Sequence, residues 1–542
     1  MNNSGLNCFW SNQIIDLLYK KGIRYACISP GSRNTPLVNA FVNHSKIECF
    51  SHIDERSSAF FALGLTKKSL NPVVVLTTSG TATANLFPAI IEGSLSMKPL
   101  IIITADRPEN LVNTGENQTI NQANIYGDYV RKMENLNKNK SVGILKKIDS
   151  LVNISLGEKN IPGPVHLNIR FKEPLLDNKK LKITYKPKPI KINNKNRSFS
   201  ITKFKRPVIV CGELSSSKPV DIVQLSNKLN CPILADSLSN LRYYKNKNVL
   251  AYYDHYIDKL DKMPDCIVRF GKKPVSKNLT TLINKCKKSS FLIDPYLSFN
   301  DDCPNVIKSS LNNINFIFGN NIDYKWIEKI LKFEECTKKL VEKMKFNNKS
   351  EITLVETIAN KLNNNDILFI GNSMPIRIFD QFSGKLKNNI KLFSNRGASG
   401  IDGIISTSLG ISHLNKNSKN FLLIGDVSLF HDSNAFHILK NTNINLTIIV
   451  VNNKGGQIFS RLSYSNNNIK DFEKFWITPP LTKIDDLANL FKIKYYNLDI
   501  KEVNSRLEKI SNLKGVKLIE VKINSKTDIK ISEKLSQQIS LI

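Results

Sequence analysis

The stretch INLTIIVVNNKGGQIF, residues 444–459, changes character abruptly in its middle. Its first half is a short run of mostly branched apolar side chains, which is typical of a strand buried on both faces. The run ends in two asparagines, a lysine and two glycines, and the chain turns apolar again at Ile458 and Phe459. In open α/β sheets, ligands bind at the carboxyl ends of the strands. The stretch therefore predicts a buried parallel strand that ends in a binding loop.

Similar strands, each separated by a helical pattern, recur in three blocks along the 542 residues. A chain of this length exceeds what one core can bury, and alternating strands and helices indicate βαβ units. The pattern predicts an α/β fold of three consecutive doubly wound parallel-sheet domains, at residues 1–178, 200–337 and 350–542, with a Lys/Asn/Pro-rich linker at 177–205. The expected strands are RYACIS (24–29), PVVVLTT (72–78) and PLIIITA (99–105); RPVIVCGE (206–213), CPILADS (231–237), DCIVRFG (265–271) and SFLIDP (290–295); and DILFIGN (366–372), IKLFSN (390–395), NFLLIGD (420–426), INLTIIVVNN (444–453) and VKLIEVKI (516–523). The clearest expected helices are residues 11–22, 55–69 and 352–362.

Composition excludes several classes of protein. Hydrophobic residues make up 41% of the chain, which is typical of a globular protein. We find no run of about 18 apolar residues and no secretory signal at the N-terminus, so we expect a cytoplasmic protein without a membrane span. The nine cysteines form no CxxC pair and the seven histidines no HExxH motif. A disulfide framework or a zinc site is therefore not expected.

The formal net charge of +32 raises the alternative of a basic nucleic-acid-binding protein. The lysines are spread over the whole chain together with abundant asparagine, and no nucleic-acid-binding module is recognisable. We interpret the charge as compositional and expect no nucleic-acid partner. Tight DNA binding at physiological salt would favour the alternative, because charge-driven affinity falls steeply with salt.

Polar residues follow two of the expected strands in the third block. Asp426 comes directly after NFLLIG, and Asn453 lies 27 positions further on (453 − 426). A strand–helix–strand crossover fits this interval, which would bring both residues to one sheet edge. A carboxylate, an amide oxygen and the carbonyl of Gly455 suit Mg²⁺, whose usual companion is a phosphate group. The alternative is that Asp426 caps a helix and NNKGG is a surface turn.

Several arginines also lie in Gly/Ser/Pro-rich turns after expected strands. A planar guanidinium is suited to bind carboxylates, whereas a single arginine of this kind is usually a surface or salt-bridged residue. Together they favour substrates with several carboxylates. The cations are Arg33 in SPGSRNTPL, Arg107 in TADRPEN, Arg377 in GNSMPIR, Arg396 in SNRGASGIDG and Lys277 in GKKPVSK.

These motifs resemble those of the thiamine diphosphate enzymes. The GDG…N element of that family is similar to Gly425, Asp426 and Asn453, although Val427 replaces its second glycine. The strings SPGSRNTPL, HIDERSSAFFALG, TSGTATANLFPA, TADRPEN with GENQTINQ, GNSMPIR, NRGASGIDG and NNKGGQIFS, in this order, look like the branch that joins 2-oxoglutarate to isochorismate in menaquinone and phylloquinone biosynthesis. The resemblance covers both outer domains, and the middle one contributes little beyond FGKKPVSK.

The resemblance implies thiamine diphosphate and Mg²⁺ (or Mn²⁺) as cofactors. Glu55 matches the glutamate that hydrogen-bonds the aminopyrimidine N1′ and so promotes loss of the thiazolium C2 proton. Asp426, Asn453 and the Gly455 carbonyl would hold the metal. The residues implied to contact the cofactor are Glu55, Thr78, Ser79, Gly80, Gly425, Asp426, Val427, Ser428, Asn453, Gly455, Gly456, Ile458 and Phe459.

The same resemblance implies a transferase that decarboxylates 2-oxoglutarate and adds the succinyl unit to isochorismate in a conjugate (1,4) fashion. Ser373, Arg377 and Arg396 would hold the carboxylates of 2-oxoglutarate or its adduct. Isochorismate would be positioned by Ser32, Arg33, Arg107, Asn117, Gln118 and Lys277, and the further implied substrate contacts are Ile458, Phe459 and Leu462. Asn278 stands where a second cation is expected after Lys277.

In the family, the catalytic glutamate reaches a cofactor held by a partner subunit, so the resemblance implies a homodimer or a dimer of dimers with shared active sites. The alternative within the same fold is another thiamine diphosphate-dependent 2-oxo acid decarboxylase or carboligase. Such an enzyme would need fewer arginines, because its substrates carry fewer carboxylates. Turnover of pyruvate without isochorismate would favour it.

Overall fold

The structure is a computed structural model that describes residues 3–136, 143–158, 161–176, 185–190, 196–214, 218–296, 300–317, 319, 321–344 and 347–542. The expected end of the first domain, residue 178, and much of the expected linker lie outside these residues. None of the described helices has both the length and the apolar character needed to cross a membrane.

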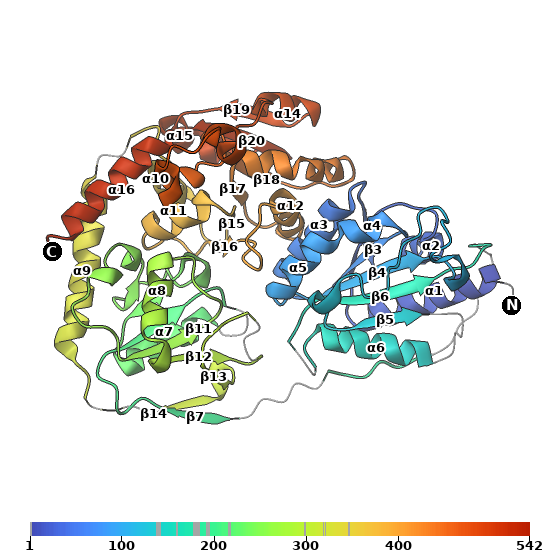
Figure 1. The fold of residues 1–542 in the computed structure, drawn as a ribbon, viewed down its shortest axis with the longest axis horizontal. Coiled ribbons are helices and arrows are strands. Elements are labelled where there is room, and N and C mark those ends of the chain that lie inside the picture. Colours follow the sequence, from blue (N-terminus) through green and yellow to red (C-terminus); the bar gives the residue numbers. More distant parts are fainter. Residues whose placement is uncertain are drawn as a thin grey trace. The chain divides into compact units, whose positions relative to one another are not determined.

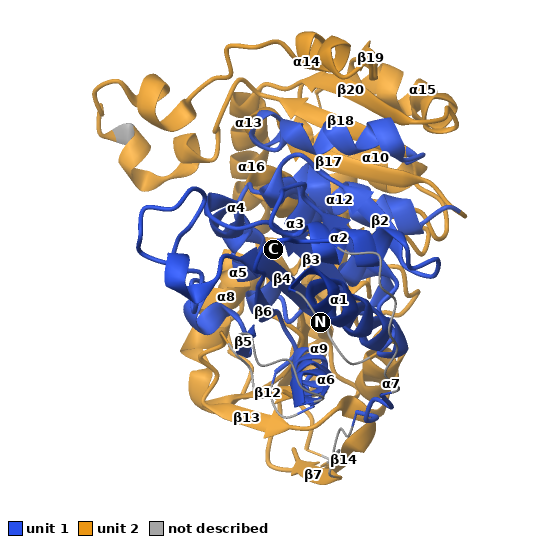
Figure 2. Cartoon of the chain, turned by 90° about the vertical axis from the view of Figure 1, so that its right-hand side faces the viewer, with its two compact units in different colours: residues 1–192, 395–416, 428–445 blue, residues 193–394, 417–427, 446–542 orange. Residues whose placement is uncertain are grey.

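The chain forms two compact units, which Figure 2 colours separately. Unit 1 contains residues 1–192, 395–416 and 428–445, and unit 2 contains residues 193–394, 417–427 and 446–542. Two pieces of the third sequence block therefore belong to the same unit as the first block. The boundaries of the three expected domains stay a prediction.

Unit 1 is built around one parallel six-stranded sheet, with α1 and α6 on one side and α3 to α5 on the other (Figure 1). Its strands form the order β2-β1-β3-β4-β6-β5. The central strands β3 and β4 are buried along their whole length, as their unbroken Val and Ile runs predict. The strands are β1 (Tyr25–Ile28), β2 (Glu48–Ser51), β3 (Val73–Thr77), β4 (Leu100–Asp106), β5 (Met133–Leu136) and β6 (Val165–Arg170). The helices are α1 (Asn3–Lys20), α2 (Thr35–Val42), α3 (Glu55–Ser69), α4 (Thr81–Asn85), α5 (Phe87–Leu95), α6 (Gly143–Ser155) and α12 (Ile404–Leu414).

Within unit 1, α12 packs closely against α3 because each helix has a glycine at the contact. A methyl group at Gly64 would lie 2.1 Å from the Thr407 carbonyl oxygen, and one at Gly410 would lie 2.2 Å from the Phe61 carbonyl oxygen. Real side-chain carbons do not approach backbone this closely. The two glycines therefore permit the helix pair to form.

Unit 2 contains two parallel six-stranded sheets and a parallel two-stranded one. The second large sheet has the order β10-β9-β8-β11-β12-β13, and the third has the order β16-β15-β17-β18-β20-β19. One apolar core includes residues of both, such as Ile267 from the second and Leu368 from the third. The second large sheet contains β8 (Pro207–Cys211), β9 (Ile233–Ala235), β10 (Val249–Leu250), β11 (Cys266–Phe270), β12 (Ser290–Asp294) and β13 (Asn305–Lys308), and the third contains β15 (Ile367–Ile370), β16 (Lys391–Phe393), β17 (Asn420–Gly425), β18 (Leu446–Asn452), β19 (Lys494–Asn497) and β20 (Val516–Lys522).

Several helices of unit 2 begin at polar caps that the sequence supplies. Asp323 and Ser350 cap α9 and α10 with their side chains, and Asp499 with Glu502 forms a capping box at α15. The helices are α7 (Pro219–Leu229), α8 (Lys277–Lys285), α9 (Tyr324–Lys343), α10 (Glu351–Lys361), α11 (Met374–Phe382), α14 (Ile484–Leu490), α15 (Ile500–Ser511) and α16 (Ser525–Ile539), and α13 (Asp426–His431) begins in unit 2 and ends in unit 1.

The predicted fold class is confirmed, and each strand and helix expected from the sequence is present. Several strands of the structure were not among those expected, including β2, β5, β6, β10, β13 and β19, and the stretch interpreted as a linker contains another. β7 (Arg197–Ser200) lies in the stretch interpreted as a linker and pairs with β14 (Ile314–Ile317). The segment RSFS has one apolar residue, Phe199, and shows no strand pattern of its own. Phe199 packs against Phe291 and Phe316, which come from distant parts of the chain.

Candidate active site

Asp426 connects the tips of two neighbouring strands in unit 2. The strands β17 and β18 are parallel neighbours, with Gly425 opposite Val451. Asp426 follows β17 directly, and its Oδ2 accepts a hydrogen bond of 2.9 Å from the backbone N–H of Gly455 in the loop after β18. Its Oδ1 accepts one of 2.8 Å from the N–H of Val427. The carboxylate therefore fixes the loop beyond β18 against the end of β17.

The two adjacent asparagines at the end of β18 have different surroundings. The amide of Asn452 donates to Glu520 Oε1 on β20 at 2.7 Å, and its Oδ1 accepts from the Lys454 N–H at 3.2 Å. Asn452 thus anchors the loop to the sheet. Asn453, the residue predicted as a metal ligand, follows it as a half-buried residue at the start of the loop.

Gly455 occupies a place that only glycine fits. Its φ of +113° lies in the left-handed half of backbone space, and a methyl group there would come within 2.3 Å of the Ile477 carbonyl oxygen. The Gly455 carbonyl accepts from the Gln457 N–H at 2.8 Å, and a carbonyl oxygen can accept a second interaction. The next residues turn back toward the protein, where Ile458 packs against the apolar core while Phe459 and Leu462 are 36% and 40% exposed.

This end of the sheet fits a cation with a phosphate group. Asp426 is only 3% exposed, and its burial raises the pKa of its carboxyl, which the surrounding backbone amides oppose. A divalent cation would offset the cost of a buried negative charge. Beside it, a methyl group at Gly425 would meet no atom of the described chain within 4 Å. Asp426, Asn453 and the Gly455 carbonyl can each offer an oxygen ligand, the type that Mg²⁺ or Mn²⁺ prefers.

Glu55 is the first residue of α3 in unit 1, and its neighbour Asp54 performs the capping. Asp54 Oδ1 accepts from the N–H groups of Arg56 and Ser57 at 2.8 and 3.2 Å. Glu55 is therefore not needed as a cap. It is half-buried, and its Oε2 accepts from the amide of Asn85, at the end of α4, at 3.3 Å.

The start of α3 also contacts the stretch 428–445 of unit 1, which contains the end of α13. Arg56 Nη2 donates to the His431 carbonyl at 2.8 Å, and the amide of Asn434 donates to Asp54 Oδ2 at 3.0 Å. Ser428, a predicted cofactor contact, is buried in the same stretch of unit 1.

The loops that follow β1, β3 and β4 meet at one edge of the first sheet. Gly31 lies against Thr78, because a methyl group at Gly31 would be 2.3 Å from the Thr78 Cβ. Gly80 in turn lies against the backbone of Gln118, 3.1 Å from its carbonyl oxygen by the same measure. The hydroxyls of Thr78 and Ser79 are buried and have no hydrogen-bond partner within the described part of the chain. Such orphaned donors are costly, so a bound polar group would stabilise them.

Two predicted arginines influence each other at this edge. Burial, followed by the charge of Arg107, lowers the pKa of Arg33. Arg33 donates to the Phe171 carbonyl at 3.1 Å and to Glu173 Oε1 at 2.8 Å, while its buried Nε has no partner among the described residues. Arg107 Nε donates to the Asn117 carbonyl at 2.9 Å. The structure therefore gathers Ser32, Arg33, Arg107, Asn117 and Gln118 around the loops of unit 1.

The remaining predicted residues lie at helix starts or strand ends. Ser373 caps α11 with a φ of +72°, and its carbonyl accepts from Arg377 one turn later. Lys277 is the exposed first residue of α8, and Asn278 donates to the Asp254 carbonyl at 2.9 Å. Arg396 is half-buried in the loop before α12, in unit 1. Ser373, Arg377 and Lys277 belong to unit 2.

Sequence reasoning missed two polar residues that organise the loops of unit 1. Asn85 holds Glu55. Gln122 is 1% exposed, accepts from the Gly80 N–H at 2.9 Å, and donates to the Ala105 carbonyl at 3.2 Å and to Asn168 at 2.9 Å. Asn85 lies inside the motif TSGTATANLFPA and Gln122 inside GENQTINQ, two of the motifs on which the resemblance rests. Their place in these motifs was the one sign in the sequence that could have identified them.

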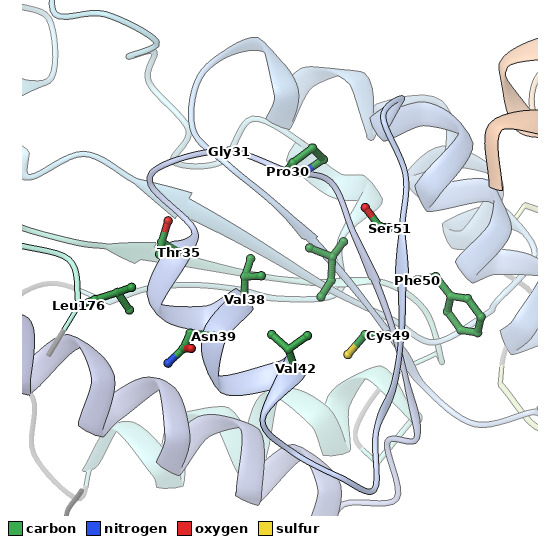
Figure 3. A pocket seen from close by; sticks show the side chains of 11 residues that line it. Pro30, Gly31, Thr35, Val38, Asn39, Val42, Cys49, Phe50, Ser51 and Leu176 are labelled. Carbon is green, nitrogen blue, oxygen red and sulfur yellow. The ribbon is translucent and has the colours of Figure 1, made fainter. Parts of the chain in front are cut away.

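A cavity of about 470 Å³ lies beside α2 in unit 1 (Figure 3). Pro30 and Gly31 border one end, and Val38, Val42 and Cys49 line its mostly apolar wall. None of the predicted site residues is among the described residues that line it.

Two parts of the chain match known families of protein domains. Residues 10–125 match the family description "Thiamine pyrophosphate enzyme, N-terminal TPP binding domain", and residues 174–370 match "Middle domain of thiamine pyrophosphate". The three parallel six-stranded sheets and these matches define a thiamine pyrophosphate enzyme.

Individual proteins that are similar to this chain indicate its family within this class of enzymes. A 2-succinyl-5-enolpyruvyl-6-hydroxy-3-cyclohexene-1-carboxylate synthase of Listeria innocua is 35% identical over 94% of this chain and 93% of its own length. Synthases of the same name from Staphylococcus aureus (35%, over 93% and 90%) and Staphylococcus haemolyticus (34%, over 88% and 88%) are similar to it as well. The chain belongs to the family of 2-succinyl-5-enolpyruvyl-6-hydroxy-3-cyclohexene-1-carboxylate synthases.

Proposed function

We propose that the chain decarboxylates 2-oxoglutarate and adds the succinyl unit to isochorismate in a conjugate (1,4) reaction, which gives 2-succinyl-5-enolpyruvyl-6-hydroxy-3-cyclohexene-1-carboxylate and CO₂. The observation that carries the proposal is the meeting of Arg33 and Arg107 with the polar loops of unit 1. The charge of Arg107 helps to lower the pKa of Arg33, so the two guanidiniums favour a bound anion, and both substrates carry carboxylates. This feature fits a synthase better than a decarboxylase of a simple 2-oxo acid.

The proposed cofactor site uses the tips of β17 and β18. Asp426, Asn453 and the Gly455 carbonyl would hold Mg²⁺ or Mn²⁺, and Gly425 leaves space for the diphosphate. Thiamine diphosphate supplies an electron sink for decarboxylation when bound. Val427 and Gly456 border this position, and Ile458 and Phe459 supply apolar surface for the cofactor ring.

Glu55 is the proposed catalytic residue, because a carboxylate at the start of α3 can hold a proton on the aminopyrimidine N1′. Since Asp54 satisfies the free amides of the helix, the Glu55 carboxylate is available for this role. Asn85 restrains its Oε2. The buried hydroxyls of Thr78 and Ser79 and the backbone of Gly80 would border the same ring.

The substrates would be held by the cations and amides of both units. Ser32, Arg33, Arg107, Asn117, Gln118 and Lys277 would orient isochorismate, and Ser373, Arg377 and Arg396 would bind the carboxylates of 2-oxoglutarate. Phe459 and Leu462 expose apolar surface in the loop after β18, which would exclude water from the reacting carbon atoms. A homodimer or dimer of dimers with shared sites, and a place in the cytoplasm, belong to the same proposal.

A product assay tests the proposed reaction. The purified chain is incubated with thiamine diphosphate, Mg²⁺, 2-oxoglutarate and isochorismate, and the products are followed by mass spectrometry. We expect consumption of 2-oxoglutarate that depends on isochorismate and yields the named product. Consumption of pyruvate without dependence on isochorismate would instead assign the chain to another thiamine diphosphate-dependent decarboxylase or carboligase.

A further inference from the structure

A buried glutamate in unit 1 binds the loop that contains Arg396. Glu92 lies on α5 and is 3% exposed. Its Oε1 accepts a hydrogen bond of 2.8 Å from the Gly397 N–H, and its Oε2 accepts one of 2.7 Å from the Ala398 N–H. Both carboxylate oxygens are thus committed to two successive amides directly after Arg396. Charge-assisted hydrogen bonds of this kind are about twice as strong as neutral ones.

The contact is close enough to require glycine at the first of these amides. A methyl group at Gly397 would lie 2.6 Å from the Glu92 carbonyl oxygen and 2.9 Å from its Oε2. The backbone of the loop therefore lies directly against α5 at Glu92. On the other side of Arg396, the amide of Asn395 donates to Thr407 Oγ1 on α12 at 3.0 Å. The loop is fixed immediately before and immediately after the arginine.

A buried lysine balances the charge of Glu92. Lys67 lies on α3, its side chain is 1% exposed, and its Nζ is 3.9 Å from Glu92 Oε1. A buried carboxylate without a positive neighbour would be costly. A buried ion pair of this kind favours a single position of the loop backbone after Arg396, because a displaced loop would leave both charges poorly satisfied.

We propose that Glu92 is a positioning residue for Arg396. By fixing the amides of Gly397 and Ala398, Glu92 fixes the backbone from which the guanidinium extends, and so sets how well Arg396 meets the carboxylate of 2-oxoglutarate. The role of Arg396 rests on the proposed function. The effect on the loop itself does not, since it concerns the chain without substrate.

The variant Glu92→Gln tests this role because glutamine has the same shape but only one acceptor oxygen, so one of the two amides loses its partner. We expect faster hydrogen exchange in the segment 395–403 of the cofactor-free protein. In the complete enzyme we expect the KM for 2-oxoglutarate to rise about 10- to 100-fold, while the KM for isochorismate stays within about twofold. A structural defect alone would not separate the two substrates in this way.

Two further variants separate positioning from stability. Asp149→Asn is the matched control, because Asp149 is also a buried carboxylate beside a buried lysine (Lys21, 3.0 Å) and also accepts from a backbone amide (Lys188, 2.9 Å). We expect it to lower the melting temperature without changing either KM. The double variant Glu92→Gln with Lys67→Met removes the charge that Glu92 balances, so it should recover part of the melting temperature and retain the raised KM.

Three outcomes would overturn the proposal. These are unchanged exchange in segment 395–403, an unchanged KM for 2-oxoglutarate in Glu92→Gln, or a KM that returns to normal together with the melting temperature in the double variant. Failure of the proposed reaction itself is recognised separately, because the exchange measurement needs no substrate. An Arg396→Ala variant with a normal KM for 2-oxoglutarate would contradict the role of the arginine and not the contact of Glu92 with its loop.

Discussion

Asp54 and Glu55 are adjacent carboxylates at the start of α3, and the structure gives them different contacts. Asp54 binds the free amides of the helix, whereas Glu55 meets only the exposed amide of Asn85 among the hydrogen bonds of the described residues. The asparagines at the end of β18 divide in the same way, since Asn452 is tied to Glu520 and Asn453 is not part of that bond. In both pairs, one residue holds the local structure, and its neighbour is the one for which we propose a role in the chemistry.

We predict that Glu55→Gln lowers kcat by about 10² to 10⁴, the usual contribution of a positioned acid or base. Affinity for thiamine diphosphate should change by less than about threefold, because the diphosphate is held elsewhere. Steady-state kinetics and calorimetric titration measure the two effects. Glu48→Gln, an exposed glutamate of the same unit, serves as the control and should keep the parental kcat. A near-parental kcat in Glu55→Gln would exclude its catalytic role.

The sequence predicts roles for Asp426, Asn453 and the arginines, because carboxylates, amides and guanidiniums after strands are visible in it. Asn85, Gln122 and Glu92 could not be identified in this way. Each acts through a contact with a distant segment, such as Glu92 with Gly397, 305 positions along the chain. Nothing in the local sequence distinguishes Glu92 from an ordinary helical glutamate.

At the scale of elements, the loop after β18 depends on glycine at one position. Lys454 and Gly455 both have positive φ, and a methyl group at Gly455 would also lie against the backbone carbonyl of Ile477. The Val/Ile run of β18 predicted the strand and its end from local pattern alone. The strand β7 escaped prediction because its stability derives from aromatic contacts with β12 and β14.

We predict that Gly455→Ala weakens metal-dependent binding of thiamine diphosphate by about tenfold or more, or about 1.4 kcal/mol, because the loop must move away from Asp426. Gly515→Ala is the matched control. Gly515 also has a positive φ, +83°, but a methyl group there would meet no described atom within 4 Å. Both variants should lose about 1 to 2 kcal/mol of stability through backbone strain, Gly455→Ala should lose more because of the Ile477 carbonyl, and only Gly455→Ala should lose cofactor affinity. Equal cofactor affinity in the two variants would refute the prediction.

The start of α10 contributes a pH-dependent element to stability. Glu351 is 2% exposed, and burial together with the nearby charge of Asp528 raises the pKa of its carboxyl to about 8. In the unfolded chain this pKa is about 4.3. Between these values the folded chain binds more protons than the unfolded one, so the stability contribution of Glu351 falls as pH rises toward 8.

We therefore expect Glu351→Gln to reduce the loss of melting temperature between pH 6 and pH 8 relative to the parent protein. Glu335→Gln, at an exposed position on α9, should follow the parent curve. Calorimetric scans at both pH values provide the measurement. If the parent and Glu351→Gln curves run parallel, the carboxyl does not titrate in this range.

At the scale of the whole molecule, the proposed residues are divided between two units, with Glu55 in unit 1 and Asp426 in unit 2. The three six-stranded sheets follow from the periodicity of the sequence. The inclusion of residues 395–416 and 428–445 in unit 1 could not be predicted, because it depends on packing such as that of α12 on α3.

Complementation tests whether active sites are shared between subunits. Glu55→Gln and Asp426→Asn chains are co-expressed with different tags, and dimers that carry both tags are isolated. If each site uses Glu55 of one chain and Asp426 of the other, a mixed dimer contains one intact site. We expect the mixed dimer to have about half of the activity of the unmodified dimer. If each site is built within a single chain, the mixed dimer should be as inactive as the dimers of either variant alone.

Calorimetric titration of thiamine diphosphate at saturating Mg²⁺ is the most direct test of whether the tips of β17 and β18 hold the cofactor. The comparison is between the parent chain, Asp426→Asn, and Asp432→Asn, in which a second buried aspartate that binds Ser406 is changed. We expect Asp426→Asn to weaken binding at least about tenfold and Asp432→Asn to remain within about threefold of the parent. Parental affinity in Asp426→Asn would contradict the proposed cofactor site.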